Sequence, residues 1–178
     1  MKKLLCVMAL AALLCFTFAC QNKAEKAELE KFRAQAKVEE ENKALVIRYR
    51  DALQKGDIEA LKEVFSPDYV GHDSRGRSAT LEKRINNINQ TRKMFSDIAY
   101  ISEDLIAKGD KVIVRYIAKG THIGDFLGMP GTGNEIKTTG IEIDRVENAK
   151  IVESWEASDD LGIFEQLGME LKPKVTKK

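Results

Sequence analysis

Beyond residue 20 the sequence contains no cysteine. All three cysteines, Cys6, Cys15 and Cys20, lie within the first twenty residues. The rest of the chain can therefore form no disulfide and offers no thiolate for nucleophilic catalysis or metal binding. This excludes enzymes that depend on a reactive cysteine, and zinc sites built from cysteines.

The sequence also lacks a basic surplus and two common catalytic motifs. It has 29 basic and 28 acidic residues, whereas a nucleic-acid-binding domain normally presents a basic face, so no nucleic-acid partner is expected. Without a Gly-x-Ser-x-Gly elbow, a serine hydrolase has no support. A phosphate-binding loop needs a helix after its glycines. The glycine-rich residues 119–134, "KGTHIGDFLGMPGTGN", are instead followed by the strand-like "NEIKTTGIEI".

The N-terminal sequence is typical of a secretory signal. Lys2 and Lys3 precede the apolar run "LLCVMALAALLCFTF", and "TFAC" places a small residue before Cys20. This segment resembles a bacterial lipoprotein signal, with a transmembrane anchor as the alternative. The resemblance implies a signal peptide over residues 1–19, lipidation of Cys20 with acyl chains such as palmitate, and a domain held outside the cytoplasm in the cell envelope. Gln21 after the lipidated residue allows outer-membrane sorting in a Gram-negative source.

Residues 20–44 are rich in alanine, glutamate and lysine and have few large apolar side chains. Such a composition favours a solvated helical stalk or linker. A coiled coil is the alternative, although Leu29, Phe32 and Val38 are few for a heptad seam. At the other end of the chain, residues 172–178 form a basic tail.

Residues 45–171 predict a single α+β domain. A helical stripe begins at Leu45 and ends at "KGD", and Asp57 and Thr80 are natural N-caps for two further helices. The stretch "DYVGHD" between them predicts irregular chain. Four strand-like runs then pair around "KGD" and "ENAK", and "DDLGIFEQLGM" predicts a final short helix. Helices followed by antiparallel strands indicate a curved sheet with the N-terminal helices packed on its concave face, which makes a cone with an open mouth.

The glycine-rich stretch places Phe126, Leu127 and Met129 where a plain hairpin would be polar. Apolar groups exposed in a loop usually cover something. They either close the end of the sheet over the core or form a lid over a pocket, and the sequence leaves both alternatives open.

Two longer segments carry a resemblance to a known family. "GTHIGDFLGMPGTGNEI" and "DRVENAKIVESWEASDDLGIFEQLG" closely resemble the SnoaL-like polyketide cyclases, and the similarity runs over about residues 45–169. The resemblance implies the cone-shaped nuclear transport factor 2-like fold. It also implies ring closure of the ester cyclase type, by aldol condensation without metal or cofactor, on an apolar or carbonyl-containing small molecule.

The resemblance also implies site residues. Asp159, four residues after Trp155, corresponds to the catalytic aspartate, and His122 is the histidine of the Gly-Thr-His motif. His72 occupies the place of a pocket histidine. Ser154 stands where the family commonly has a histidine, which favours a second reading: an envelope lipoprotein that binds a hydrophobic small molecule, or a protein, without reacting it.

Each of these residues has a structural alternative. Asp159 is also a natural N-cap for the last helix, and His72 is also an ordinary hydrogen-bonded loop residue. Two histidines without a metal-binding spacing predict no metal site. Arg115 is either an outward charge or a pocket residue that binds a carboxylate.

Phe126, Trp155 and Ser154 are further candidates for the pocket wall, with Trp155 alternatively a core aromatic. A homodimer through the outer face of the sheet is consistent with this fold, although no stretch of the sequence requires it.

Overall fold

The structure, a computed structural model, describes the backbone of residues 2–170 and 172 and the side chains of residues 23–170 and 172. The contacts divide the chain into two compact units, Met1–Val38 and Glu39–Lys178. Cys20, the predicted lipidation site, lies outside the residues whose side chains are described. Within the described part of the chain, no helix is both long and apolar enough to cross a membrane.

Helix α1 (Lys2–Lys55) contributes to both units. In the first unit, the side chains from residue 23 onward are exposed, apart from the half-buried Gln35. Leu29, Phe32 and Val38 are among these exposed residues. This part of α1 is a helix that buries almost no apolar surface, as its composition predicts.

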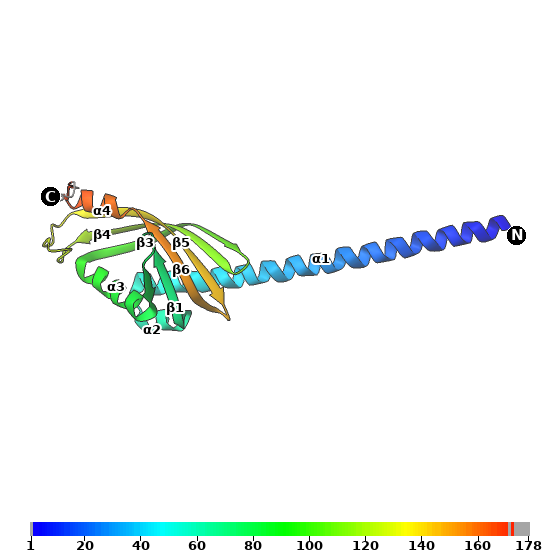
Figure 1. The fold of residues 1–178 in the computed structure, drawn as a ribbon, viewed down its shortest axis with the longest axis horizontal. Helices are drawn as coiled ribbons and strands as arrows, with labels where there is room; N and C mark the ends of the chain where they lie inside the picture. Colours follow the sequence, from blue (N-terminus) through cyan, green and yellow to red (C-terminus); the bar gives the residue numbers. More distant parts are fainter. Residues whose placement is uncertain (1, 171, 173–178) are drawn as a thin grey trace, which may run out of the picture. The chain divides into compact units, whose positions relative to one another are not determined.

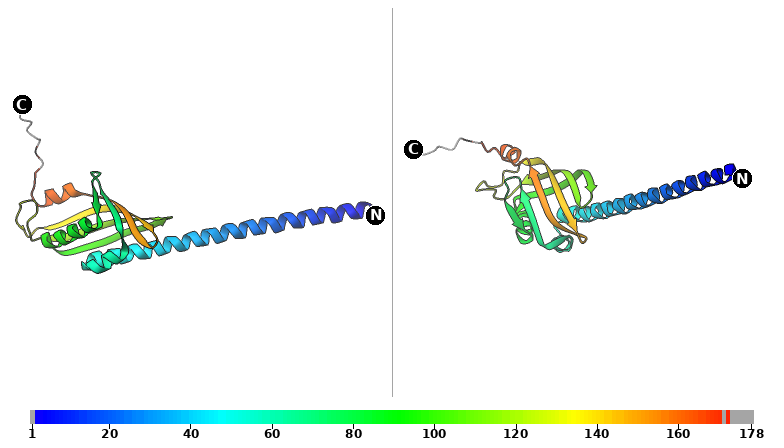
Figure 2. Two further views of the ribbon diagram at one scale, coloured as in Figure 1. Left: turned by 60° about the horizontal axis from the view of Figure 1, so that its bottom comes forward. Right: turned by 45° about the vertical axis from the view of Figure 1, so that its right-hand side comes forward.

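The second unit is an α+β domain built on one six-stranded sheet (Figure 1). The strand order is β2-β1-β6-β5-β4-β3, and the views in Figure 2 show that the sheet is curved. After α1, the elements are α2 (Ile58–Val64), β1 (Phe65–Asp73), β2 (Ser78–Thr80), α3 (Leu81–Met94), β3 (Phe95–Lys108), β4 (Lys111–His122), β5 (Glu135–Glu147), β6 (Lys150–Ser158) and α4 (Asp160–Gln166).

The predicted helix starts are confirmed. Asp57 caps α2 by accepting a hydrogen bond from the Ala60 N–H, and Thr80 caps α3 by accepting one from the Lys83 N–H. The hairpins predicted around "KGD" and "ENAK" are also present, as β3–β4 and β5–β6. Short polar turns and side-chain caps therefore fix most element boundaries locally.

One prediction is wrong: "DYVGHD" is not irregular but forms most of strand β1. This strand pairs with β6 in parallel, the one parallel pairing in the sheet as described, and with β2 antiparallel. Its pairing register shifts between Phe65 and Val70, so Pro67 lies where the ladder does not need its missing N–H. The strand forms because the backbone of β6 supplies hydrogen-bonding partners for it. The residues around β1 cannot reveal this pairing, since β6 lies far away in the sequence.

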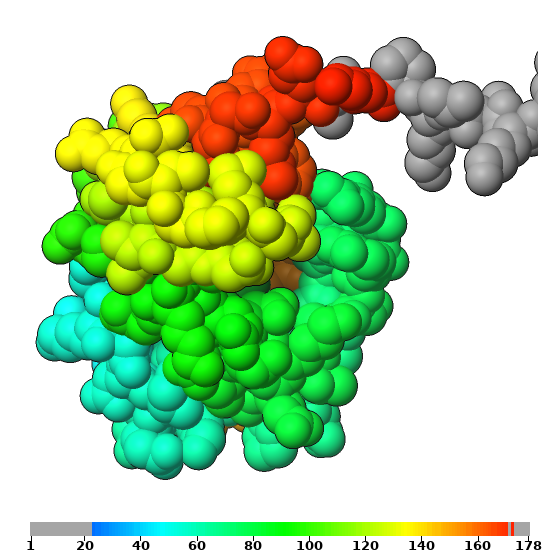
Figure 3. All heavy atoms as spheres, turned by 90° about the vertical axis from the view of Figure 1, so that its left-hand side faces the viewer, coloured from blue at the N-terminus to red at the C-terminus, as the bar shows by residue number. Residues whose placement is uncertain are grey.

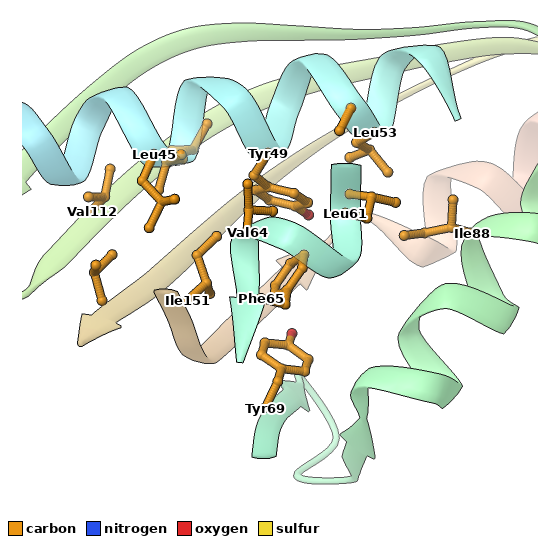
Figure 4. Close-up of a cluster of buried hydrophobic side chains, with 14 of the residues drawn as sticks. Leu45, Tyr49, Leu53, Leu61, Val64, Phe65, Tyr69, Ile88, Val112 and Ile151 are labelled. Carbon is orange, nitrogen blue, oxygen red and sulfur yellow. The ribbon is translucent and has the colours of Figure 1, made fainter. Parts of the chain in front are cut away.

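The main core lies between the helices and the concave face of the sheet (Figure 4). Buried side chains from α1, α2 and β1 meet those from β4 and β6; they include Leu45, Tyr49, Leu53, Leu61, Val64, Phe65, Tyr69, Val112 and Ile151. Burying a side chain of this size stabilises the fold by about 1.5–3 kcal/mol. The helices therefore cover the inner surface near the narrow end and leave the other end open.

The domain also uses α1 residues that precede Leu45. The Asn42 side chain donates to the Gly109 carbonyl at 3.0 Å, and the Glu39 carboxylate accepts from the Gly109 N–H at 3.0 Å. These bonds attach α1 to the turn of the β3–β4 hairpin. The packed domain thus begins several residues before the start that the apolar pattern suggests.

Candidate functional site

The open end of the domain contains an apolar pocket of about 320 Å³. It is bordered by α3, strands β3, β4 and β5, the end of β6, α4 and the loop of residues 123–134, which we call the mouth loop. Figure 3 shows a hollow on this face, between the mouth loop, α4, α3 and the region of β1 and β2. The lining is mostly apolar or aromatic and includes Met94, Phe95, Ile98, Tyr100, Tyr116, Phe126, Ile136, Ile163 and Phe164.

The mouth loop contributes directly to this pocket. Phe126 lines it and packs near Phe95 and Phe164, with ring centroids 6.0 and 5.8 Å apart. Met129 packs against the small cluster around Phe95, while Leu127 is 73% exposed. The loop therefore covers the end of the sheet and also forms part of the pocket wall. The sequence had left these two roles open as alternatives, and the loop has both positions at once.

Few polar groups face the apolar pocket, and one of them is a carboxylate. Asp160, the first residue of α4, lines the pocket, and its Oδ1 accepts a hydrogen bond from Ser158 Oγ at 2.7 Å. Tyr100 and Tyr116 present phenol groups from the sheet. Burial, followed by the nearby Glu156, raises the pKa of Tyr100, so its hydroxyl remains protonated at neutral pH.

Beneath the pocket, the concave face carries a buried network of charged groups. Glu142 and Glu156 are directly opposite each other on β5 and β6, an arrangement that is unfavourable for two bare carboxylates. Arg84 from α3 bridges them, with Nη2 2.5 Å from Glu142 Oε1 and Nη1 2.9 Å from Glu156 Oε2. Arg50 and the Tyr49 hydroxyl also donate to Glu142. Two arginines thus compensate two carboxylates.

The environments of the two glutamates differ. Burial raises the pKa of Glu142, and the Arg84 guanidinium only partly offsets this. For Glu156 burial acts in the same direction, but Arg84 and the hydrogen bond from Tyr116 outweigh it and lower the pKa. These interactions favour the ionised form of Glu156, whose carboxylate accepts hydrogen bonds from Arg84 and Tyr116.

Tyr116 connects this network to the pocket. Its ring lines the apolar pocket, and its hydroxyl donates to Glu156 Oε1 at 2.5 Å. The facing residue on β5 is Gly140, where a Cβ would lie 2.5 Å from the Tyr116 hydroxyl. The guanidinium of Arg50 lies over the other part of the ring, 4.7 Å from its centroid. The phenol is thus fixed on all sides.

A third buried acid, Asp144, lies two residues after Glu142 on strand β5 and on the same face of the sheet. It is fully buried opposite Ser154, whose hydroxyl donates to Asp144 Oδ1 at 2.5 Å. Among the described residues, Oδ2 has no hydrogen-bond partner. Burial, then the neighbouring Glu142, raises the pKa of Asp144 well above its usual value. Both causes favour the neutral, protonated form of this acid.

A second cavity, of about 360 Å³, lies beside the first and is polar. It is formed by β1, β2, the start of α3 and one residue of β6. Its lining includes His72, Asp73, Arg77, Ser78, Lys83, Arg84, Asn87 and Glu156. Arg84 and Glu156 thus belong both to the buried network and to the wall of this cavity.

The three residues that the resemblance implies as catalytic do not face one cavity. Asp159 is exposed and caps α4, where its Oδ1 accepts from the Gly162 N–H at 2.9 Å. It borders a shallow depression with Arg115 and Ile141 on the outer side of the sheet, not the apolar pocket. The placement matches the N-cap alternative and brings the next residue, Asp160, to the pocket instead.

His122 is fully buried behind the pocket wall. Its Nδ1 accepts from the Thr132 N–H at 3.3 Å and lies 3.1 Å from Thr132 Oγ1. Among the described residues Nε2 has no partner, and the ring packs against Phe95 and Phe126. The histidine therefore supports the mouth loop and the pocket aromatics.

His72 lies among the residues of the polar cavity, and its ring stacks on Trp155 with the ring centroids 5.5 Å apart. Its Nε2 is 2.9 Å from Glu153 Oε1. Trp155 alternates with the inward Ser154 along β6 and so belongs to the outer face. These aromatic rings stabilise the β1–β6 pairing rather than line the apolar pocket.

The remaining predicted pocket residues are divided between the two faces of the sheet. Phe126 lines the apolar pocket, whereas Arg115 is on the outer face and pairs with Glu103 and Asp104. Ser154 is on the inner face but reaches Asp144, not the pocket. No group of three or more histidine, cysteine or acidic residues in the described part of the chain is arranged to hold a metal ion.

Sequence reasoning missed the buried network. In "TTGIEIDRV" the acids Glu142 and Asp144 alternate with Ile141 and Ile143, and apolar residues normally face the core. Here the acids face inward, and Ile141 is 48% exposed on the outside. The alternation was a visible signal, but the side of the sheet that faces the cavity could be assigned only with the register.

The curved sheet with helices on its concave face and an enclosed pocket defines the class of nuclear transport factor 2-like α+β proteins. Solved structures agree with this. IdmH from Streptomyces antibioticus, described as a candidate polyketide cyclase, is 30% identical, with a TM-score of 0.66 over 72% of this chain and 99% of that one. AclR from Streptomyces galilaeus, described as a candidate hydroxylase, is 25% identical, with a TM-score of 0.69 over 73% and 97%.

Within this class, the family model of the SnoaL-like polyketide cyclases matches residues 43–167, and the chain belongs to that family. It is also 26% identical over 128 residues to the aklanonic acid methyl ester cyclase DnrD of Streptomyces peucetius. That match covers 70% of this chain and 88% of the relative. The neighbouring names include both a cyclase and a hydroxylase, so the fold alone does not define the reaction.

Proposed function

We propose that this protein catalyses cofactor-independent acid–base chemistry on a small carbonyl compound held in the apolar pocket, with ring closure of the aldol type as the reaction. The observation that supports this most is the position of Asp160, a half-exposed carboxylate at the wall of a mostly apolar pocket, 3.9 Å from the Arg75 guanidinium. A carboxylate at the wall of a binding pocket can act as a general base when it lies within hydrogen-bond reach of the bound substrate.

The proposed steps use only groups around the pocket. Asp160 removes a proton from the carbon next to a carbonyl, and the protonated Tyr100 hydroxyl donates a hydrogen bond to the enolate oxygen that develops. The enolate carbon then bonds to a second carbonyl carbon of the same molecule. The new alkoxide takes the proton back from Asp160. No atom is gained or lost, and no oxidant is needed.

The residue assignment departs from the resemblance, which implies Asp159 as the base. Asp159 is engaged as the N-cap of α4, while Ser158 orients Asp160 at the pocket. A matched pair of variants separates the two, since asparagine is as good an N-cap as aspartate. Asp159→Asn should keep the helix and most of the turnover. Asp160→Asn should lose turnover by about 10²–10⁴-fold.

The test substrate is aklanonic acid methyl ester, on which the curated relative acts by name. Because aldol ring closure leaves the mass unchanged, the product is identified by its retention time and fragmentation in liquid chromatography–mass spectrometry. Loss of turnover in Asp159→Asn but not in Asp160→Asn would return the base role to Asp159. Equal turnover in both variants would contradict carboxylate catalysis at this end of the pocket.

A second candidate function is binding of an apolar molecule without reaction. Ser154, which replaces the histidine common in the family, supports it because its hydroxyl is engaged with the buried Asp144 and supplies no proton carrier to the pocket. This function predicts saturable binding, no product from any of several carbonyl compounds, and equal affinity in the unmodified protein and Asp160→Asn.

A further inference from the structure

The polar cavity beside the apolar pocket has an uncompensated positive charge. Arg77 pairs with Asp73 at 2.5 Å, and Arg84 is engaged with Glu142 and Glu156. For Lys83, at the start of α3, no carboxylate among the described residues lies within ion-pair distance of its ammonium group. With the other charges of the cavity paired, Lys83 leaves it one positive charge in excess.

The carboxylate of Glu156, which borders the same cavity, does not cancel this charge. Its Oε1 accepts from Tyr116, and its Oε2 accepts from Arg84. Both oxygens are therefore occupied by donors: Tyr116, which lies outside this cavity, and Arg84, which is part of its wall. Ser78 and Asn87 add neutral hydrogen-bonding groups to the lining. A single unpaired cation with neutral donors fits a monoanion better than a dianion, which would also face Asp73.

The two cavities meet at one hydrogen bond. Tyr116 lines the apolar pocket and Glu156 lines the polar cavity, and their side chains are joined at 2.5 Å. A molecule whose apolar body lies against the Tyr116 ring therefore has a polar cavity next to it, on the other side of this pair. The Tyr116–Glu156 pair is therefore the border between an apolar and a polar space, which have no lining residue in common.

We propose that the natural ligand is an apolar carboxylic acid: its body occupies the apolar pocket, and its carboxylate occupies the polar cavity, bound by the Lys83 ammonium group with Ser78 and Asn87. This proposal rests on the proposed function in that it takes the apolar pocket as the binding site. It goes further by naming the substrate class as a free acid, whereas the curated relative acts by name on a methyl ester.

The proposal can be tested with anthracene-9-carboxylate and its methyl ester, which share one apolar body. Fluorescence titration of the full chain should show the acid binding about tenfold more tightly than the ester, since a hydrogen bond to a charged group is at stake. The preference should decrease at high salt because screening weakens the ion pair. Lys83→Met should abolish the preference by weakening only the acid.

Lys93→Met, at the other end of the same helix, borders neither cavity and serves as the control; it should leave both affinities unchanged. Equal binding of acid and ester to the unmodified protein would overturn the proposal. So would equal weakening of both probes by Lys83→Met, or binding of neither. Asp160→Asn leaves the polar cavity intact, so this variant should keep the preference for the acid while it loses turnover. If the unmodified protein shows the preference but turns over no carbonyl compound, the proposed reaction alone is contradicted.

Discussion

The buried acids of the concave face are each stabilised in a different way. Glu156 and Glu142 share Arg84, and Arg50 provides a second positive charge for Glu142. Asp144 has no basic partner among the described residues and is bound only by the Ser154 hydroxyl. A lone buried charge is so costly that such a group takes up a proton instead.

This difference predicts a stabilising substitution. The raised pKa of Asp144 means that the folded state retains a proton that the unfolded chain releases above a pKa of about 4. Stability therefore decreases as pH rises from that value towards the folded-state pKa, and each unit between the two costs about 1.4 kcal/mol. Asp144→Asn should remove this loss, so the variant should be more stable than the unmodified protein at pH 7.5.

Urea unfolding at pH 5 and pH 7.5 measures the effect. The advantage of Asp144→Asn should grow between the two values. Asp68→Asn removes one negative charge from an exposed position of β1 and is the control, with no comparable change expected. A variant that is less stable than the unmodified protein at pH 7.5 would show that Asp144 is ionised in the folded domain.

At the level of elements, strands β4 and β5 determine the shape of the site. Their register places Gly140 opposite Tyr116 and Glu142 opposite Val114. Because side chains alternate along each strand, this register sends Glu142 and Asp144 inward and Ile141 and Ile143 outward. A shift by one residue would place Ile141 and Ile143 in the cavity and the carboxylates outside.

Gly140→Ala tests how tightly the strands hold the site. The added Cβ would lie 2.5 Å from the end of the Tyr116 ring, which is buried and hydrogen-bonded to Glu156 and so cannot move freely. The variant should lose about 1–3 kcal/mol of stability and bind apolar probes more weakly. Thermal unfolding and probe titration measure the two effects.

Thr139→Ala, at the adjacent exposed position of β5, is the matched control and should change both quantities little. If Gly140→Ala had unchanged stability and binding, the space opposite Gly140 would be larger than this register implies, and Tyr116 would not be fixed as described.

On the scale of the whole molecule, the chain combines a packed domain with a helical segment. In that segment the described side chains, residues 23–38, bury almost no apolar surface. All the buried apolar side chains of both core clusters come from residues 45–167. The described side chains of residues 23–38 therefore contribute little to the stability of the domain. We propose that this segment connects the domain to a membrane through a lipid on Cys20, as the N-terminal sequence indicates.

Expression in a bacterial host with radiolabelled palmitate tests this proposal. The unmodified protein should be labelled and should sediment with membranes, since several acyl chains give stable anchoring at about 0.8 kcal/mol per buried methylene. Cys20→Ser should lose both the label and the membrane association. Cys15→Ser, inside the apolar run, is the control and should retain both. If the Cys20→Ser variant were still labelled with palmitate, the lipid would be attached at another residue, and the proposed processing at Cys20 would be wrong.

Much of the fold follows from the sequence alone. The caps Asp57 and Thr80, the hairpin turns and the strand-like runs act within a few residues of each other, so local chemistry decides them. The similarity to the SnoaL-like cyclases added the fold and the mouth loop. Strand β1 and its short antiparallel partner β2 were missed, because β1 forms against β6, which begins 77 residues after β1 ends.

The site depended on tertiary structure to a much larger extent. The resemblance implied Asp159 as the catalytic residue, whereas in the structure Asp159 caps α4 and Asp160 lies at the pocket wall. The sequence could not show that Arg84, Glu142, Glu156 and Tyr116 meet, because they come from four elements and none belongs to a local motif. Local chemistry specifies elements, whereas convergence of side chains depends on register and packing between segments far apart in the chain.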